Sequence, residues 1–98
     1  MNDQKETKHE QDGEPMVEVI YLNTNEDAKF HTPWSHTAQQ TWDTAYAKLG
    51  EQKKTGDQFE TQDGKSLMPY LALTLSQLRD QHISANRKFQ IKCETGGA

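Results

Sequence analysis

A stripe of apolar side chains between residues 35 and 50 constrains the fold most, because it fits only a helix that is covered along one side. The stripe recurs at helical spacing and consists of Ala38, Trp42, Ala45, Tyr46 and Leu49. Thr37, followed three residues later by Gln40, fits a capping box, and Gly50 fits the helix end. The sequence therefore predicts one amphipathic helix, from Ser35 to Gly50, that must pack against a second layer.

The segment before this helix has the pattern of a β-hairpin. Met16–Asn23 is rich in β-branched and aromatic residues, which are typical of strands. Alternation places three of its residues on one face: Val17, Val19 and Tyr21. The charged Glu18 marks the opposite face as solvent-exposed. Residues 24–27 have turn composition, and a second strand is expected over Ala28–Thr32, where Pro33 ends it.

A second hairpin is expected after the helix. Gln58–Gln62 is a candidate strand with Phe59 pointing inward, and Asp63-Gly64 is the strongest hairpin turn in the chain. Lys65–Met68 is expected to pair back as a further short strand.

A helical turn is expected next. Leu71–Leu75 fits either a strand or a buried loop. Thr74 or Ser76 can cap a short helical turn that runs through Leu78 to Asp80.

The final strand completes the fold prediction. Arg87–Cys93 alternates cleanly, and its inner face consists of Phe89, Ile91 and Cys93. Strands that flank one helix can cover it with a single sheet. We therefore expect an α+β roll, with a mixed sheet of four to five strands packed on one helix and the last strand beside the first.

Composition limits the class of protein. With 98 residues, of which 32% are hydrophobic, the chain is expected to form one small domain. A net charge of −4, with both signs interspersed, argues against a nucleic-acid-binding module. Cys93 is the single cysteine, which favours a reducing compartment. No apolar run approaches the roughly 18 residues of a membrane span, so a cytoplasmic, monomeric protein with no membrane partner is expected.

Three segments are expected along the chain. Residues 1–15 contain no apolar residue after Met1 and predict a disordered polar tail. Residues 16–93 are expected to form the folded domain, and residues 94–98 a flexible C-terminal tail. The N-terminal tail is either an inert solubilising leader or a tether whose Lys5 and Lys8 are accessible acceptors.

Gly96 and Gly97 follow the final strand and carry the functional hypothesis. Glycine has no Cβ, so a diglycine can lie flat in a narrow channel and approach another molecule's reactive atoms closely. The alternative explanation of the same pair is an ordinary frayed terminus.

The order of elements, together with the diglycine, resembles the ubiquitin family of β-grasp proteins. Phe59–Leu67 resembles the family's strand, Gly-Lys turn and short strand ending in Leu, and Thr74–Ser76 resembles the opening of its short helical turn. Phe89–Gly97 resembles the final strand and tail, and Met16–Val19 suits the opening strand. Two features differ from the mature family members: Ala98 follows the diglycine, as in family precursors, and the apolar patch that family receptors bind is not obvious.

The resemblance implies a protein modifier that is similar to divergent bacterial ubiquitin-like proteins, which are encoded beside conjugation enzymes in systems linked to phage defence. A processing peptidase would remove Ala98, and an ATP-dependent activating enzyme would adenylate the Gly97 carboxylate. A conjugating enzyme would then pass the acyl group to an amine of a target protein, forming an isopeptide bond. Glu94 and Thr95 would dock the tail on these partners.

No catalytic residue, metal or cofactor is expected in the chain itself. The four histidines are scattered, and none pairs at a metal-ligand spacing with a cysteine or carboxylate on one face. Cys93 is expected to be an inward or edge residue of the last strand, because no histidine or asparagine constellation marks it as a nucleophile.

Two alternatives to the modifier remain open. One is a sulfur carrier of the thiamine or molybdopterin kind, which would hold a thiocarboxylate on the terminal glycine. Ala98 argues against it unless this residue is trimmed. The other is a non-conjugated β-grasp adaptor that docks through its sheet, and deletion of residues 96–98 would leave an adaptor working.

Overall fold

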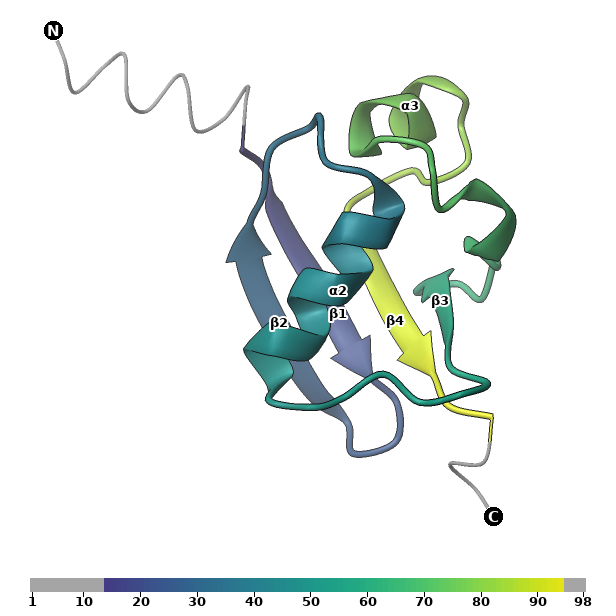
Figure 1. Ribbon diagram of the computed structural model, residues 1–98. Helices are drawn as coiled ribbons and strands as arrows, with labels where there is room; N and C mark the ends of the chain where they lie inside the picture. The colour runs from purple at the N-terminus through teal and green to yellow at the C-terminus, as the bar shows by residue number, and fades with distance from the viewer. Residues whose placement is uncertain (1–13, 95–98) are drawn as a thin grey trace, which may run out of the picture.

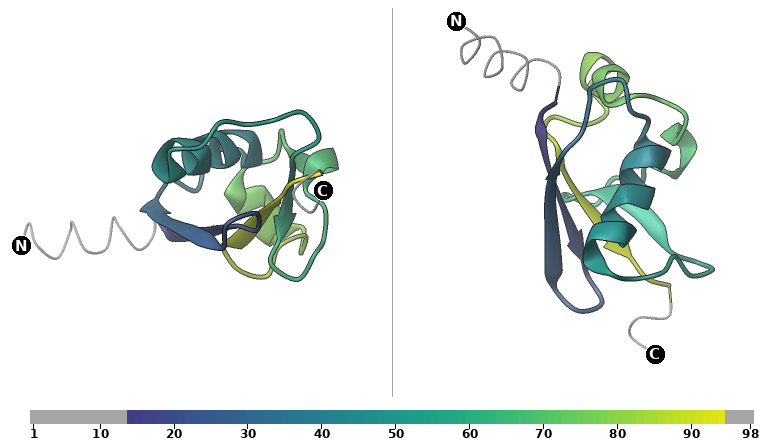
Figure 2. Two further views of the ribbon diagram at one scale, coloured as in Figure 1. Left: turned by 90° about the horizontal axis from the view of Figure 1, so that it is seen from below. Right: turned by 60° about the vertical axis from the view of Figure 1, so that its left-hand side comes forward.

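One helix crosses one face of a four-stranded mixed sheet (Figures 1 and 2). The computed structural model describes residues 14–94. In chain order the elements are β1 (Met16–Tyr21), β2 (Glu26–His31), α2 (Ala38–Leu49), β3 (Gln58–Thr61), the 3₁₀ turn η1 (Met68–Tyr70), α3 (Leu75–Asp80) and β4 (Lys88–Lys92).

The sheet has the strand order β2-β1-β4-β3. β1 pairs antiparallel with β2, where Val19 faces Ala28, and parallel with β4, where Val19 faces Phe89. β3 pairs antiparallel with β4 at the other side, where Phe59 faces Ile91. The predicted α+β class, with a mixed sheet on one helix and the last strand beside the first, is therefore confirmed. The arrangement is compatible with a β-grasp-like fold.

Local chemistry sets the ends of α2. The Thr37 side chain accepts a hydrogen bond from the Gln40 backbone N–H, and the Gln40 side chain accepts one from the Thr37 N–H, which completes the predicted capping box. Gly50 ends the helix with φ 72°, a left-handed conformation that favours glycine. Four members of the predicted stripe are buried, and Leu49 is partly buried at its end.

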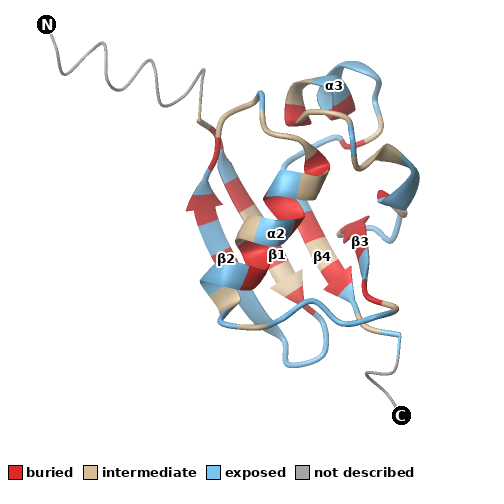
Figure 3. Cartoon of the chain, viewed as in Figure 1, coloured by how far each residue is buried: buried red, intermediate tan, exposed pale blue. Residues whose placement is uncertain are grey.

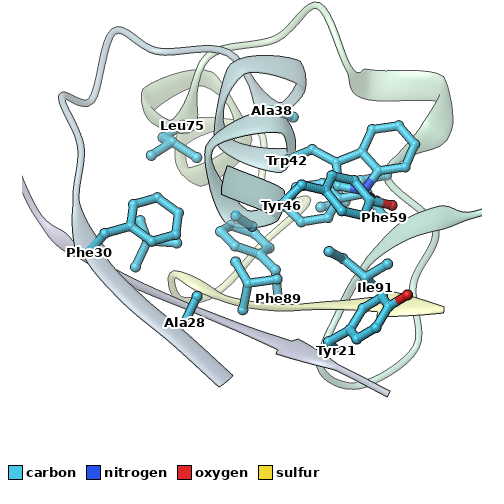
Figure 4. Packing of buried hydrophobic residues seen from close by; sticks show 14 of the residues in the cluster. Tyr21, Ala28, Phe30, Ala38, Trp42, Tyr46, Phe59, Leu75, Phe89 and Ile91 are labelled. Carbon is cyan, nitrogen blue, oxygen red and sulfur yellow. Dashed lines mark hydrogen bonds between the residues drawn. The ribbon is translucent and has the colours of Figure 1, made fainter. Parts of the chain in front are cut away.

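An aromatic stack joins the helix to the sheet (Figure 4). The Trp42 ring centroid lies 5.8 Å from that of Phe59, and Phe59 lies 5.1 Å from Phe89. Such aromatic contacts stabilise a core beyond the area they bury. Along β1, buried residues alternate with more exposed ones, as predicted (Figure 3). α2 covers the face of the sheet to which the buried residues point.

The predicted strand over Lys65–Met68 is wrong. Only an isolated bridge joins Glu60 to Ser66, although the Leu67 N–H donates to the Phe59 carbonyl at 2.8 Å. Pro69 enters the 3₁₀ turn directly afterwards, so the chain leaves the sheet before a ladder can form. The turn itself is present: Gly64 has φ 94° and its N–H donates to the Thr61 carbonyl at 2.9 Å.

The remaining elements match one of the predicted options each. Leu71–Leu75 is irregular up to residue 74, so a loop forms rather than the strand, and it is only partly buried, with Ala72 exposed. Thr74, and not Ser76, caps α3 through a second capping box with Gln77. β1 and β2 are joined by a turn two residues earlier than expected, because Asn25 adopts φ 68° and its N–H donates to the Tyr21 carbonyl at 2.7 Å.

Candidate functional site

Most of the predicted site residues lie outside the part of the chain that the structure describes. These are Lys5 and Lys8 near the start, and Thr95, Gly96, Gly97 and Ala98 near the end. Glu94 is the last described residue and marks the root of the predicted tail. The described part of the candidate site is therefore the tail root, which consists of Glu94, the end of β4 and the surface around them.

β4 brings the root to the surface from the middle of the sheet. It lies between β1 and β3, and the Ile91 carbonyl accepts a further hydrogen bond from the Leu22 N–H at 3.1 Å. Ile91 is buried, Cys93 is half-buried and Glu94 is exposed. The chain thus leaves a firmly held strand and reaches solvent within three residues, at the end of the sheet opposite α3 (Figure 1).

The loop between α2 and β3 supports the root through Gly56. An added Cβ at Gly56 would lie 2.7 Å from the Cβ of Glu94 and 2.9 Å from its Cδ, and it would overlap Oε1. Gly56 also has φ 92°, which residues with a Cβ rarely adopt. Glycine is therefore required here for the backbone and for the space that Glu94 fills.

A buried hydrogen-bond chain fixes this loop to α2. The Trp42 indole N–H donates to the Tyr46 hydroxyl at 3.1 Å, and this hydroxyl donates to Asp57 Oδ2 at 2.7 Å. The same carboxylate oxygen accepts the Lys54 N–H at 3.0 Å. Burial, together with the bond to Asp57, raises the pKa of Tyr46 above its ordinary value, so this phenol remains a neutral donor.

Tyr21 and Cys93 fill the space behind the root. The neighbouring Cys93 thiol, followed by burial, raises the pKa of Tyr21 to about 12. The buried Tyr21 hydroxyl has no hydrogen-bond partner among the described residues, so the Cys93 thiol lies near it without hydrogen-bond geometry. Burial and the negative charge of Asp57 raise the pKa of the Cys93 thiol in turn. A thiol that stays protonated is a poor nucleophile.

The groups around the root are held by packing and hydrogen bonds. Its polar groups are neutral phenols, a protonated thiol and a carboxylate that is already hydrogen-bonded. Within residues 14–94, no group of three His, Cys, Asp or Glu side chains could hold a metal ion. The same residues contain no helix that is long and apolar enough to cross a membrane.

The described lysines do not single out one acceptor. All seven are exposed. Lys53 contacts both a carboxylate and an aromatic ring: its Nζ lies 2.7 Å from Asp43 Oδ1 and 4.0 Å from the Trp42 ring centroid. Lys29 approaches Asp27 at 4.0 Å. The others are Lys48, Lys54, Lys65, Lys88 and Lys92.

Sequence reasoning missed the supporting contacts of the root. Residues 51–57 have only the composition of a polar loop, and nothing in this composition pairs Gly56 with Glu94 or Asp57 with Tyr46. The one local signal was the Gly56-Asp57 dipeptide, because glycine beside an aspartate often marks a constrained turn.

The open face of the sheet, as far as residues 14–94 show it, is mostly polar. Along β1 it also carries the exposed Met16 and the half-buried Ile20, with the exposed Leu22 just beyond the strand. Comparison with known proteins finds no family profile that matches the chain and no curated protein that is similar to it.

Proposed function

We propose that this chain is a ubiquitin-like protein modifier, activated at the Gly97 carboxylate and joined to target proteins through it, in a bacterial conjugation system of the kind linked to phage defence. One observation carries the proposal: β4, paired on both sides, ends at an exposed root, and the diglycine begins two residues beyond Glu94. A firm body with a narrow chain end close to its surface is what activation by another enzyme requires.

Three features of the root support this use. Glu94 rests on Gly56, so the direction in which the chain leaves the body is set by a contact. The loop that carries Gly56 is fixed to α2 through Asp57 and Tyr46. Fully extended, residues 94–97 reach about 13 Å, which is enough to enter a cleft while the folded body stays outside.

The chemistry would proceed in four steps, all driven by partner enzymes. A peptidase hydrolyses the Gly97–Ala98 bond and frees the Gly97 carboxylate. A carboxylate oxygen attacks the α-phosphorus of ATP, which forms an acyl adenylate and releases pyrophosphate. A nucleophile of the activating or conjugating enzyme displaces AMP, and a target amine then displaces that nucleophile to form an amide. The modifier contributes the carbonyl and a slim approach, since Gly96 and Gly97 lack side chains.

The test uses the full chain and the activating enzyme, conjugating enzyme and peptidase encoded beside its gene. Intact mass should show loss of one alanine, and pyrophosphate release should follow when ATP is added. Gly97→Leu should abolish adenylation without unfolding the body, whereas Gly64→Ala, at a distant turn with open space around it, should leave adenylation intact.

Two results would refute the proposal. Adenylation that persists in Gly97→Leu would remove the steric argument. A partner interaction that survives deletion of residues 96–98, with no covalent product in the intact chain, would favour an adaptor. Exchange of one oxygen for sulfur at Gly97 would instead identify a sulfur carrier.

A further inference from the structure

Both arginines of the chain lie against the same tryptophan. Trp34 is half-buried in the connection between β2 and α2. The Arg79 guanidinium of α3 lies 4.5 Å from its ring centroid, and that of Arg87, just before β4, lies 5.5 Å away. In a chain with nine lysines and a net charge of −4, this places the two guanidinium groups at one point of the surface.

A small hollow opens beside this tryptophan. It has a volume of about 60 Å³, room for several waters and hence for the end of a branched aliphatic side chain. Its floor is apolar and is formed by Leu75, Leu78 and Phe89, while residues 84–86 form part of its rim. A wider polar depression of about 300 Å³ shares that rim and continues toward Asp63.

The hollow has a fixed framework. The Ser76 N–H donates to the Trp34 carbonyl at 3.1 Å, which fastens α3 to the connection that carries the ring. Ser84 is buried, and its hydroxyl donates to the Asn86 carbonyl at 2.5 Å. A preformed hollow limits the ordering that a ligand must impose, so more of its contact energy appears as affinity.

The arginines keep donors available. Arg87 donates through Nε to the Met16 carbonyl at 3.2 Å, but its Nη1 and Nη2 have no hydrogen-bond partner within residues 14–94. Arg79 uses Nε on Asp80 at 3.1 Å and Nη2 on Ser76 at 3.3 Å, which leaves Nη1. A guanidinium with two free donors matches the two oxygens of a carboxylate.

We infer that this surface, the Trp34–Arg79–Arg87 site, binds a short acidic segment of a partner protein. A carboxylate of the segment binds the open donors of Arg87, with Arg79 adding charge, and a neighbouring Val or Leu side chain enters the hollow. The acidic tail of this chain fits less well, because residues 2–13 contain no large apolar side chain to fill the apolar floor.

The site lies at the end of the sheet opposite the tail root. β4 runs away from it, and α3 stands at the end where β1 and β4 begin (Figure 1). From Arg87 to Glu94 the chain spans about 23 Å at strand rise. A partner could therefore bind here whether or not Gly97 is conjugated, so the inference does not depend on the proposed function.

The experiment is a titration of the isotopically labelled full chain, followed by NMR, with the capped hexapeptide Gly-Asp-Glu-Leu-Asp-Gly. The Trp34 indole N–H and Arg87 Nε–H signals should shift, and those of the buried Trp42 should not. Replacing Leu by Gly in the peptide, or its acids by Lys, should weaken binding about 10-fold or more, since burial of a leucine side chain and a charge-assisted hydrogen bond each contribute about that much.

Variants assign the effect to the arginines. Arg87→Gln should weaken peptide binding about 10-fold, and Arg79→Gln should weaken it less. Arg87→Lys keeps the charge but loses the paired donors of the guanidinium, so its affinity should lie between those of the parent and Arg87→Gln. Lys53→Gln is the matched control, because it removes the cation from the other tryptophan, Trp42. It should leave binding unchanged.

Three results would overturn the inference. These are Trp34 signals that do not move with millimolar peptide, equal shifts with the Lys peptide, and an Arg87→Gln variant that binds as well as the parent. The full chain with Asp3→Asn, Glu6→Gln, Glu10→Gln and Asp12→Asn adds a fourth check. Shifts at Trp34 caused by these changes, without peptide, would show that the chain's own tail occupies the site.

Discussion

Substitution of Gly56 should loosen the tail root. The same substitution at Gly64 is the control, because it introduces the backbone strain without a contact to Glu94. Gly56 and Gly64 have nearly the same φ, 92° and 94°, but only Gly56 has atoms within 4 Å of an added Cβ. An alanine in the left-handed region costs about 1–2 kcal/mol at either position. Gly56→Ala must in addition displace Glu94, and overpacking of this kind costs about 1–3 kcal/mol.

The expected loss in the free energy of unfolding is therefore about 2–5 kcal/mol for Gly56→Ala and about 1–2 kcal/mol for Gly64→Ala. Urea denaturation followed by tryptophan fluorescence would measure both, because Trp42 is buried in the core. The excess should disappear when Gly56→Ala is combined with Glu94→Gly, which removes the side chain that the new Cβ meets.

Two outcomes would refute this reasoning. Equal destabilisation by Gly56→Ala and Gly64→Ala would mean that Glu94 moves aside freely and that the contact does not hold the root. An excess that persists in the Glu94→Gly background would place its cause in the loop and not in the contact with Glu94.

Three further predictions concern the body. Asp57→Ala should lower the free energy of unfolding by about 2–4 kcal/mol in urea denaturation, because it leaves the buried Tyr46 hydroxyl and a backbone N–H without their acceptor; a loss below about 1 kcal/mol would contradict this. Thr37→Ala and Thr74→Ala should each lower it by about 1 kcal/mol through loss of a capping box, with Thr→Ser restoring most of it. Tyr21 has a folded pKa of about 12 against an ordinary 10.0, so its contribution to stability should be complete below pH 10 and be lost as the pH rises through 12. Tyr21→Phe should flatten that alkaline decline in pH-dependent denaturation, and an unchanged decline would assign it to other groups.

The sequence predicted best where neighbouring residues decide the structure. Thr37 and Gln40 lie three positions apart and complete their capping box within one helical turn, so the cap of α2 could be predicted from these residues alone. The helix predicted from Ser35 begins three residues later, at Ala38, because Thr37 is the extended N-cap residue. The alternation along β1 likewise predicted its buried face, because each side chain needs only the period of a strand to be assigned.

Prediction failed where a short segment depends on its partner. Lys65–Met68 follows a strong turn and has the pattern of a returning strand, but its backbone-to-backbone hydrogen bonds with β3 are those of Lys65 and Leu67 before Pro69 diverts the chain. A turn signal shows that the chain reverses, and it does not fix how many residues then pair.

The candidate site shows the same difference between residues that are adjacent in the sequence and residues that meet only in the fold. The diglycine is visible in the sequence because its two residues are adjacent, whereas Gly56 supports Glu94 across 38 positions and is visible only in the fold. The grouping of Trp34 with Arg79 and Arg87 is another case, since three elements must fold before the residues meet.

The position of β4 has a consequence for how the protein is made. Among the strands of residues 14–94 it is the last to leave the ribosome, and yet it sits in the interior of the sheet and joins the hairpin at one side to β3 at the other. Pairings between such distant parts of a chain form late and slowly. A nascent chain that lacks residues 88–92 therefore has the β1–β2 hairpin and a β3 without its ladder partner, and native structure should appear only after synthesis has passed this point.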